Sequence, residues 1–407
     1  MKKWIRNIWI FICIVVFIIA FSSSYLSLSM DNLAYVLAIG IDKSEENMLQ
    51  VSFEFSTTSK ATESGSMEKT PTVLNSVTAS SISTAINLMN SYLGKELNMS
   101  HCKIIIFSEE LASEGISEEI YTLINDTEIR PSANLVVSKC TAKQYMKKTS
   151  PELENLISKY YENFTNSSQY SGFIPNSTIG DFFNALISET SQPYAILGGL
   201  TEEKSINQAD NDRQENYNIK ANEAPIEGKN QSENIGMAVF KNDKLVGELS
   251  AMETISFLTI NNKINRFLIS VPDPYDHNHY LDIYISPNGS TKVKIDTSNS
   301  SPYIKVNTQF TGRIYSMSEN SKYLDPTVLD TISHSCNRYL ESILSDYLYK
   351  TAKEFKSDIN DFGVYALGNF FTTEQVSNYN WLDNYKNSFF DVSVDTSIKS
   401  GMLMTET

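Results

Sequence analysis

The chain has 407 residues, which is enough for two or three domains that each bury a core. It carries 33 basic and 48 acidic side chains, and three of the basic ones lie within the first six positions, so the remainder is strongly acidic. That balance argues against nucleic acid as a partner and against binding to an anionic membrane face by charge alone.

The N-terminus has the layout of an export signal. Lys2, Lys3 and Arg6 precede a fourteen-residue run, 8–21, that has no charged side chain. The basic residues are expected to stay in the cytoplasm, so the chain after residue 30 faces outward. A signal peptidase could cut after Ser22 or Ser24. Alternatively, flanking apolar and aromatic residues extend the run toward the roughly 20 residues that span a bilayer. We expect the second outcome, with residues 1–30 as a retained transmembrane anchor.

Residues 31–200 read as an N-terminal α/β domain. Two strands, 33–41 and 48–55, are joined by a polar turn, and a loop follows over 57–72. Next we expect a helix from about Ser80, a strand, two short helices and a strand over 97–139, and then further elements. The helix–strand order of 97–139 predicts a parallel strand pair. The further elements are helices at 151–164 and 178–188 and a strand at 195–200.

Residues 201–234 are strongly polar and read as a linker. Residues 235–407 read as a C-terminal α/β region, with a further split near residue 271 as an alternative. It should begin with a hairpin over 235–247 and a helix over 250–259. Strands are expected at 264–271, 280–286 and 291–296, the last two as a hairpin turning at Pro287–Ser290. An alternating strand over 303–314, a helix from Asp325 to Lys350, shorter helical turns and a final strand over 390–398 complete a mixed α+β chain.

Candidate catalytic groups are few. There is no GxSxG, P-loop, HExxH or GxGxxG motif, and the isolated His101 and His334 are expected to be structural. The segment 273–282 contains His277 and His279 near acidic residues, so a metal site is conceivable, but a polar loop between strands is the preferred interpretation. The paired carboxylates at 109–110, 118–119 and 202–203 are expected to be solvated. We therefore assign no catalytic, cofactor-binding or metal-ligating residue.

Four cysteines without a CxxC pattern do not make a disulfide scaffold or a zinc site. Buried free thiols are the preferred interpretation for the three outside the apolar run, although a Cys102–Cys140 disulfide is an alternative.

Several blocks resemble the Ger(x)C family of spore germination proteins, the C subunits of nutrient germinant receptors. In the first half these are AIGIDK at Ala38–Lys43, the helix start at Ile82–Ala85, HCKIIIFSEELASEGI at His101–Ile116 and EIR at Glu128–Arg130. In the second half they are the following blocks, which occur in the family's order: Gly236–Thr254, Thr311–Ile314, Asp361–Gly363 and Trp381–Val394.

The resemblance implies a three-domain mixed α/β fold without catalytic activity or cofactor. It implies a place on the outer face of the spore inner membrane, beside an A-type and a B-type membrane subunit, in the response to germinants. Family members usually carry a lipobox cysteine after the signal, and here Ala20–Tyr25 contains none. Cys13 lies inside the apolar run, so we expect the run itself to replace the lipid anchor. The alternatives are an exported envelope enzyme, or a wall-associated binding protein if the run is cleaved.

Overall fold

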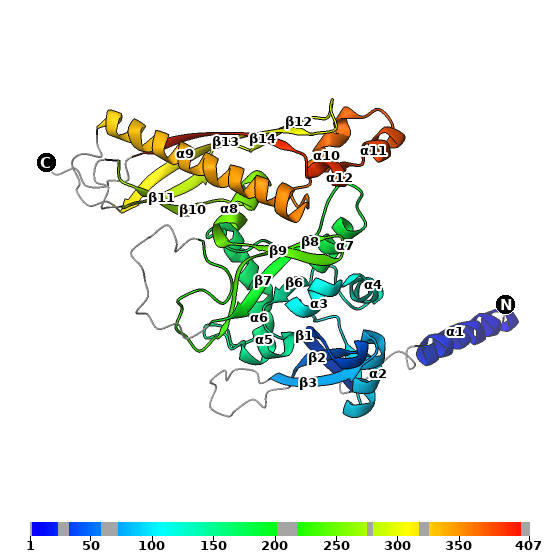
Figure 1. Ribbon diagram of the computed structural model, residues 1–407. Helices are drawn as coiled ribbons and strands as arrows, with labels where there is room; N and C mark the ends of the chain where they lie inside the picture. The colour runs from blue at the N-terminus through cyan, green and yellow to red at the C-terminus, as the bar shows by residue number, and fades with distance from the viewer. Residues whose placement is uncertain are drawn as a thin grey trace.

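The computed structural model describes residues 2–22, 32–57, 72–201, 218–274, 280–316 and 325–399. Two mixed β-sheets dominate it, one in the lower and one in the upper part of Figure 1. The mixed α/β class predicted from the sequence is confirmed.

The first sheet has nine strands in the order β3-β2-β1-β5-β6-β7-β8-β9, with β4 pairing beside β1. Neighbouring strands are parallel from β1 to β7 and antiparallel toward both edges. The central strands are almost entirely apolar because helices cover both of their faces. The strands are β1 (Leu33–Lys43), β2 (Leu49–Ser56), β3 (Thr72–Ala79), β4 (Glu96–Asn98), β5 (Ile104–Ser108), β6 (Asn134–Ser138), β7 (Tyr194–Leu200), β8 (Ser232–Lys241) and β9 (Lys244–Leu249).

Alternate side chains of these strands feed two separate cores. Ile39 and Ile41 of β1 pack in one core with α2, α3, α4 and α7, whereas Ala38 packs in the other with α5 and α6. The helices are α2 (Ile82–Leu93), α3 (Glu109–Glu114), α4 (Ser117–Asn125), α5 (Ala142–Lys148), α6 (Ile157–Asn163) and α7 (Ile179–Leu186).

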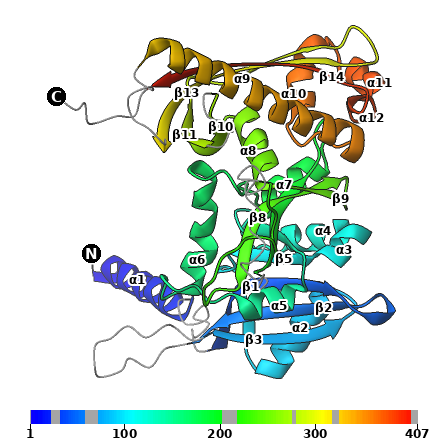
Figure 2. The same ribbon diagram turned by 60° about the vertical axis from the view of Figure 1, so that its left-hand side comes forward.

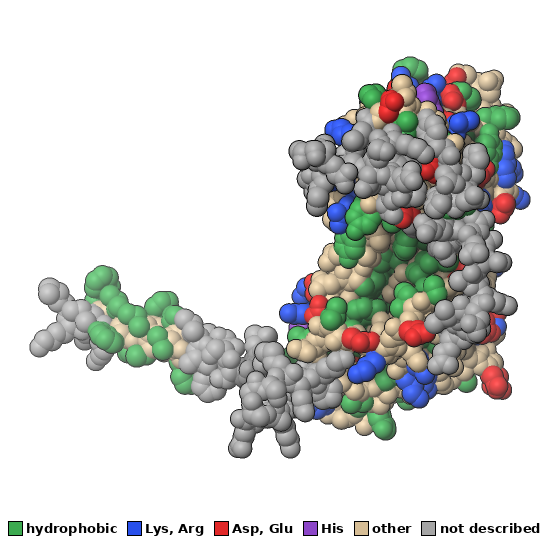
Figure 3. Space-filling model, turned by 90° about the vertical axis from the view of Figure 1, so that its left-hand side faces the viewer, with side chains coloured by type: hydrophobic (Ala, Val, Ile, Leu, Met, Phe, Trp, Pro, Cys, Tyr) green, Lys and Arg blue, Asp and Glu red, His purple; other side chains and the backbone are tan. Residues whose placement is uncertain are grey.

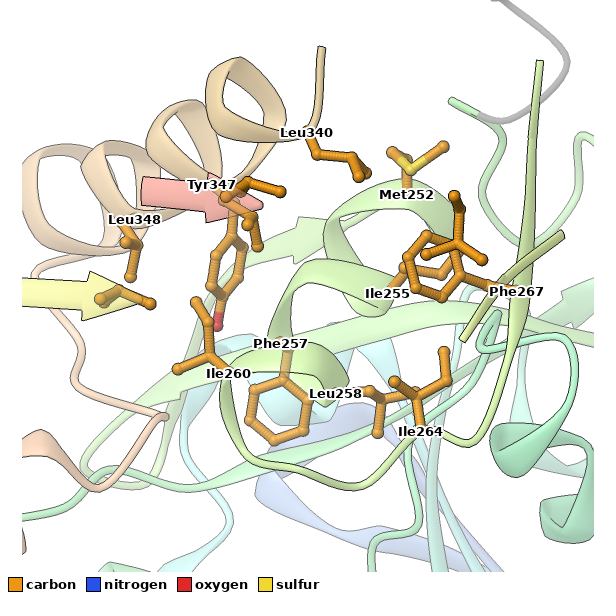
Figure 4. Close-up of a cluster of buried hydrophobic side chains, with 14 of the residues drawn as sticks. Met252, Ile255, Phe257, Leu258, Ile260, Ile264, Phe267, Leu340, Tyr347 and Leu348 are labelled. Carbon is orange, nitrogen blue, oxygen red and sulfur yellow. The ribbon is translucent and has the colours of Figure 1, made fainter. Parts of the chain in front are cut away.

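Helix α8 (Ala251–Ile260) lies between the two sheets. Every residue in it except Glu253 is buried, which is the pattern of a helix surrounded by protein on all sides. Its start is fixed by a capping box between Ser250 and Glu253. Figure 4 shows its side chains, among them Phe257 and Ile260, packed in one cluster with Tyr347 and Leu348 of α9 and with Phe267 of β10.

The second sheet consists of β10 (Phe267–Pro272), β11 (Tyr280–Pro287), β12 (Lys292–Asp296), β13 (Tyr303–Ser316) and β14 (Phe389–Lys399), and α9 (Pro326–Tyr349) crosses it. The predicted alternation of β13 is confirmed, because Ile304, Val306, Phe310 and Ile314 are all buried. After α9, the chain reaches β14 through a π-helical turn (Lys350–Phe355) and three short helices, α10 (Phe362–Ala366), α11 (Thr373–Tyr379) and α12 (Trp381–Tyr385).

The predicted hairpin at Pro287–Ser290 is wrong. β11 pairs with the second half of β13 (Ile283↔Ile314) and β12 with its first half (Val293↔Val306), both antiparallel, so the chain continues along β13 instead of reversing. Asn288 N donates to the Gln309 carbonyl at 2.8 Å, and Gly289 takes a φ of 91°. The turn residues therefore make a local kink in one edge, and a positive φ favours glycine there.

Other differences concern short elements. β3 occupies the end of the predicted loop and the residues after it, α5 was not predicted, and the helix expected from Pro151 begins at Ile157. Residues 202–217 of the predicted linker lie outside the described residues, and its last three residues begin β8, which extends the first sheet together with β9. The domain bounds proposed above, 31–200 and 235–407 with a split near 271, remain predictions.

The N-terminal segment forms helix α1 (Lys2–Ser22), and its side chains from Ile8 to Phe17 are exposed and almost all apolar (Figure 3). Within the described part of the chain, none of the helices combines the length and apolarity that crossing a membrane requires.

Candidate functional site

Several of the blocks that carry the family resemblance contribute residues to buried polar networks. Asp42 lies in the AIGIDK block, and its carboxylate accepts hydrogen bonds from Ala142 N at 2.6 Å and Lys143 N at 3.1 Å, at the start of α5. A side chain at Gly40 would collide with the Met146 sulfur, so the block also lets α5 approach β1 closely. Burial raises the pKa of Asp42, and the two amide donors oppose that rise. These two hydrogen bonds hold the start of α5 against the end of β1.

A second buried carboxylate lies on β2. Glu54 accepts from the Tyr161 hydroxyl and from the Thr72 hydroxyl, both at 2.8 Å. Burial raises its pKa, while these two donors lower it. The two hydrogen bonds join α6 and the start of β3 to β2, so this buried carboxylate has a structural role.

Asp358 lies at the centre of the third network. Its carboxylate accepts from Gly363 N and Trp381 Nε1 at 2.8 Å, and from Asn360 N and Phe362 N at 3.2 Å. Burial raises the pKa of this carboxyl to about 7, against the lowering effect of its donors. The carboxylate of Asp358 therefore joins the Asp361–Gly363 block to the block that begins at Trp381.

The loop around Asp358 also connects the upper part of the molecule to the first sheet through hydrogen bonds. Gln192 N donates to the Asp358 carbonyl at 2.9 Å, and the Gln192 side chain accepts from Asn242 N in the β8–β9 turn. The Ser357 hydroxyl donates to the Phe240 carbonyl at 2.6 Å. Any side chain at Gly363 would clash with the backbone at Thr190, so this glycine lets the two parts meet.

The candidates singled out in the sequence do not converge. His101 is exposed and packs edge-on against Tyr35, with ring centroids 4.9 Å apart, and His334 is exposed on α9. His277 and His279 lie outside the described residues, so the conceivable metal site at 273–282 is untested. Over the ranges that the structure covers, no three His, Cys, Asp or Glu side chains are grouped as metal ligands.

The paired carboxylates and the cysteines also have structural environments. Glu110 and Glu118 are exposed, as expected, and Glu110 pairs with Lys43. Glu109 and Glu119 are half-buried instead, and burial raises the pKa of both, while residues 202–203 lie outside the described residues. All four cysteines are free thiols, so the Cys102–Cys140 disulfide is not formed. Burial raises the pKa of Cys102 and of Cys336 to about 12, which keeps both thiols protonated.

A surface hollow that the sequence did not predict lies between the β12–β13 turn and α11. It has a volume of about 830 Å³ and is lined by Asp296, Phe370, Phe371 and Tyr379 among others, with Phe371 96% exposed. The signal that could have located it, a Gly-Asn-Phe-Phe run at 368–371 within the predicted helical turns, is weak on its own.

Taken together, the described side chains define a mixed α/β protein whose buried polar groups fasten helices and sheets to one another. Comparison with known proteins identifies the family of this chain. Residues 27–198 match the family described as "Spore germination protein N-terminal domain" and residues 235–401 match "Spore germination B3/GerAC like, C-terminal".

Two relatives support the match. The spore germination protein GerQC of Bacillus cereus is 21% identical over 309 residues, which cover 74% of this chain and 75% of that protein. The crystal structure of the GerBC protein resembles this one with a TM-score of 0.51 at 16% identity, over 88% of this chain and 96% of that one. The chain belongs to the GerAC/GerBC-like family of spore germination proteins, the C subunits of germinant receptors.

Proposed function

We propose that this protein is a non-enzymatic subunit of a spore nutrient germinant receptor and acts with an A-type and a B-type integral-membrane subunit to trigger germination. The observation that carries the proposal is the match of both family models, in order, to residues 27–198 and 235–401. The buried carboxylates support it as well, because the oxygens of Asp42, Glu54 and Asp358 are engaged in holding elements together.

The proposal places the folded part on the outer face of the spore inner membrane, with α1 as a retained anchor. Its support is the sequence, in which the uncharged run 8–21 follows Lys2, Lys3 and Arg6 and is extended by flanking apolar and aromatic residues toward the roughly 20 that span a bilayer. With no cysteine in Ala20–Tyr25 to carry a lipid, α1 is the attachment that the sequence offers. The three-domain division of the folded part belongs to the same proposal.

Deletion of the gene tests the function. We expect the deletion strain to lose, or to delay at least tenfold, germination with one or more nutrients, and the wild-type chain supplied in trans to restore it. A chain lacking residues 2–22 but exported by a cleavable signal should fail to restore it, because it is not held at the membrane. Normal germination of the deletion strain with every nutrient tried would contradict the receptor function.

A further inference from the structure

The outer edge of β3 differs from the edge of the other sheet. Among the described residues, β3 pairs with β2 alone. In contrast, three amides on the free edge of β14 are bonded by side chains of α9: Val394 N to Glu341, Thr396 N to Asn337 and Ile398 N to Ser333, at 3.0, 2.8 and 3.3 Å. The edge of β14 is therefore covered by side chains of α9, whereas the backbone at the edge of β3 is available to pair with a further strand.

The composition of this edge is also unusual. No Asp, Glu, Lys or Arg occurs between Lys69 and Lys95, although a fifth of all residues in the chain are charged. This stretch contains β3 and α2 completely. Proteins commonly protect exposed edge strands with charged residues or proline, and β3 contains neither. An uncharged edge favours strand addition.

Helix α2 supplies an apolar wall beside this edge. It follows β3 after Ser80 and Ser81 and runs back along it, and the two elements are in contact (Figure 2). Leu88 and Tyr92 are four residues apart, so they share one flank, and they are 47% and 76% exposed. The opposite flank, with Ser83 and Ile86, borders α4 across a small hollow. The flank with Leu88 and Tyr92 therefore faces the β3 side.

The strand contributes to the same face. Val77 packs in the core that contains α2, and Val73 lies four residues earlier, so both point to the α2 side of the sheet. Val73 is 43% exposed. We use the word groove for the β3 edge together with the exposed side chains of Val73, Leu88 and Tyr92, because an open strand edge beside a helix flank is the arrangement in which extended peptides bind by strand addition.

The groove lies near the point where the chain enters the folded part from α1. Val73 pairs with Phe55, and Phe55 pairs with Val36, close to the start of β1 at Leu33. Two strand spacings, about 10 Å, separate Val73 from Val36. The eleven peptide units from the end of α1 at Ser22 to Leu33 reach at most about 40 Å. A partner embedded in the same membrane is therefore within reach of the groove.

We propose that an extended, uncharged segment of a membrane subunit of the receptor docks in this groove and adds a strand to β3. Its backbone pairs with the β3 edge, and its alternate apolar side chains contact Leu88 and Tyr92. We assign the groove to a membrane subunit and not to a second copy for two reasons. The groove lies near Leu33, where the chain enters from the proposed anchor α1, and the net negative charge of the chain disfavours the association of two copies. The inference rests on the proposed function.

Photo-crosslinking in dormant spores tests the groove with the full chain. Tyr92→benzoylphenylalanine is compared with Tyr121→benzoylphenylalanine, since Tyr121 is also an exposed tyrosine, at 45% against 76% for Tyr92, and lies on α4. We expect a crosslink from position 92 to a membrane subunit, at least tenfold above that from position 121. A crosslink from position 92 to a second copy of this chain would overturn the proposal, as would equal yields from both positions.

A charge variant gives an independent readout. Leu88→Glu combined with Tyr92→Glu should reduce the co-purified membrane subunits at least tenfold, while Tyr121→Glu leaves the yield unchanged. Both replaced side chains are exposed, so the thermal midpoint of the double variant should match the wild type. Unchanged co-purification of the double variant would refute the groove and leave the receptor function intact. If the wild-type chain co-purified with no membrane subunit, the proposed function itself would fail, and the groove with it.

Discussion

At the scale of single residues, Asp358 shows two opposing effects on one buried carboxylate. Four donors favour its charged form, while burial opposes ionisation and raises its pKa to about 7. In the unfolded chain an aspartate ionises with a pKa near 3.9. Between about pH 4 and 7 the folded protein therefore holds a proton that the unfolded chain has lost. The contribution of Asp358 to stability is full below this window and decreases as the pH rises through it.

Comparison of the wild type with Asp358→Asn tests this sign. Between pH 5 and pH 7.5, the free energy of unfolding of the wild type should fall relative to the variant by roughly 1–3 kcal/mol, since one pKa unit corresponds to about 1.4 kcal/mol. The other buried carboxylates are present in both chains, so their contributions cancel in the difference. Urea unfolding at the two pH values measures it. A difference between the two chains that stays constant with pH would contradict the argument.

The sequence singled out part of this network but not its centre. Asp361–Gly363 and Trp381 were recognisable as family blocks, whereas Asp358 itself was not proposed for any role. Its donors Gly363 N and Trp381 Nε1 are 5 and 23 residues later in the chain, and Gln192 is far earlier. Local periodicity carries no information about such contacts, because only the folded chain brings these groups together.

At the scale of elements, α9 substitutes for a neighbouring strand beside β14. Ser333, Asn337 and Glu341 are spaced by four residues on the helix, about 6 Å per step. Their partners on β14 are spaced by two residues, about 6.8 Å per step. The two repeats match closely enough for three successive hydrogen bonds, which cover an edge that would otherwise invite pairing.

Asn337→Ala should therefore lower the free energy of unfolding by about 1–2 kcal/mol, because it leaves the backbone amide of the buried Thr396 without its acceptor. Arg338→Ala is the matched control, since Arg338 is the next residue on α9 and is exposed; its effect should stay within about 0.5 kcal/mol. Chemical denaturation of both variants compares them directly. Equal losses would show that the Asn337–Thr396 bond contributes nothing specific.

The elements differ in how well the sequence predicted them. β13 and α9 are long, and their alternating and helical apolar patterns extend over several repeats, so the sequence predicts both close to their observed bounds and predicts the buried face of β13. β3 was missed because asparagine, serine and threonine interrupt its apolar residues, and α5 because it has only seven residues. The Pro-Asn-Gly-Ser signal at Pro287 predicted a reversal, but the long partner β13 holds both flanking strands on one edge.

At the scale of the whole molecule, the two sheets are joined by packing and by hydrogen bonds. Helix α8 is buried between them, and β8 contributes Met237 and Val239 to the core of the upper part. The Asp358 loop adds polar contacts to Gln192 and to Phe240 of the first sheet. The GerAC/GerBC-like family is shown by matches in both parts. The membrane subunits and the α1 anchor are proposals that concern the molecule in its membrane.

Purification of the tagged full chain from detergent-solubilised membranes of dormant spores tests these proposals most directly. The co-purified proteins are identified, and the mass of the recovered chain gives its N-terminus. We predict that both membrane subunits accompany the chain and that it retains α1. A chain that begins near Ser23 and is recovered without either subunit would contradict the account.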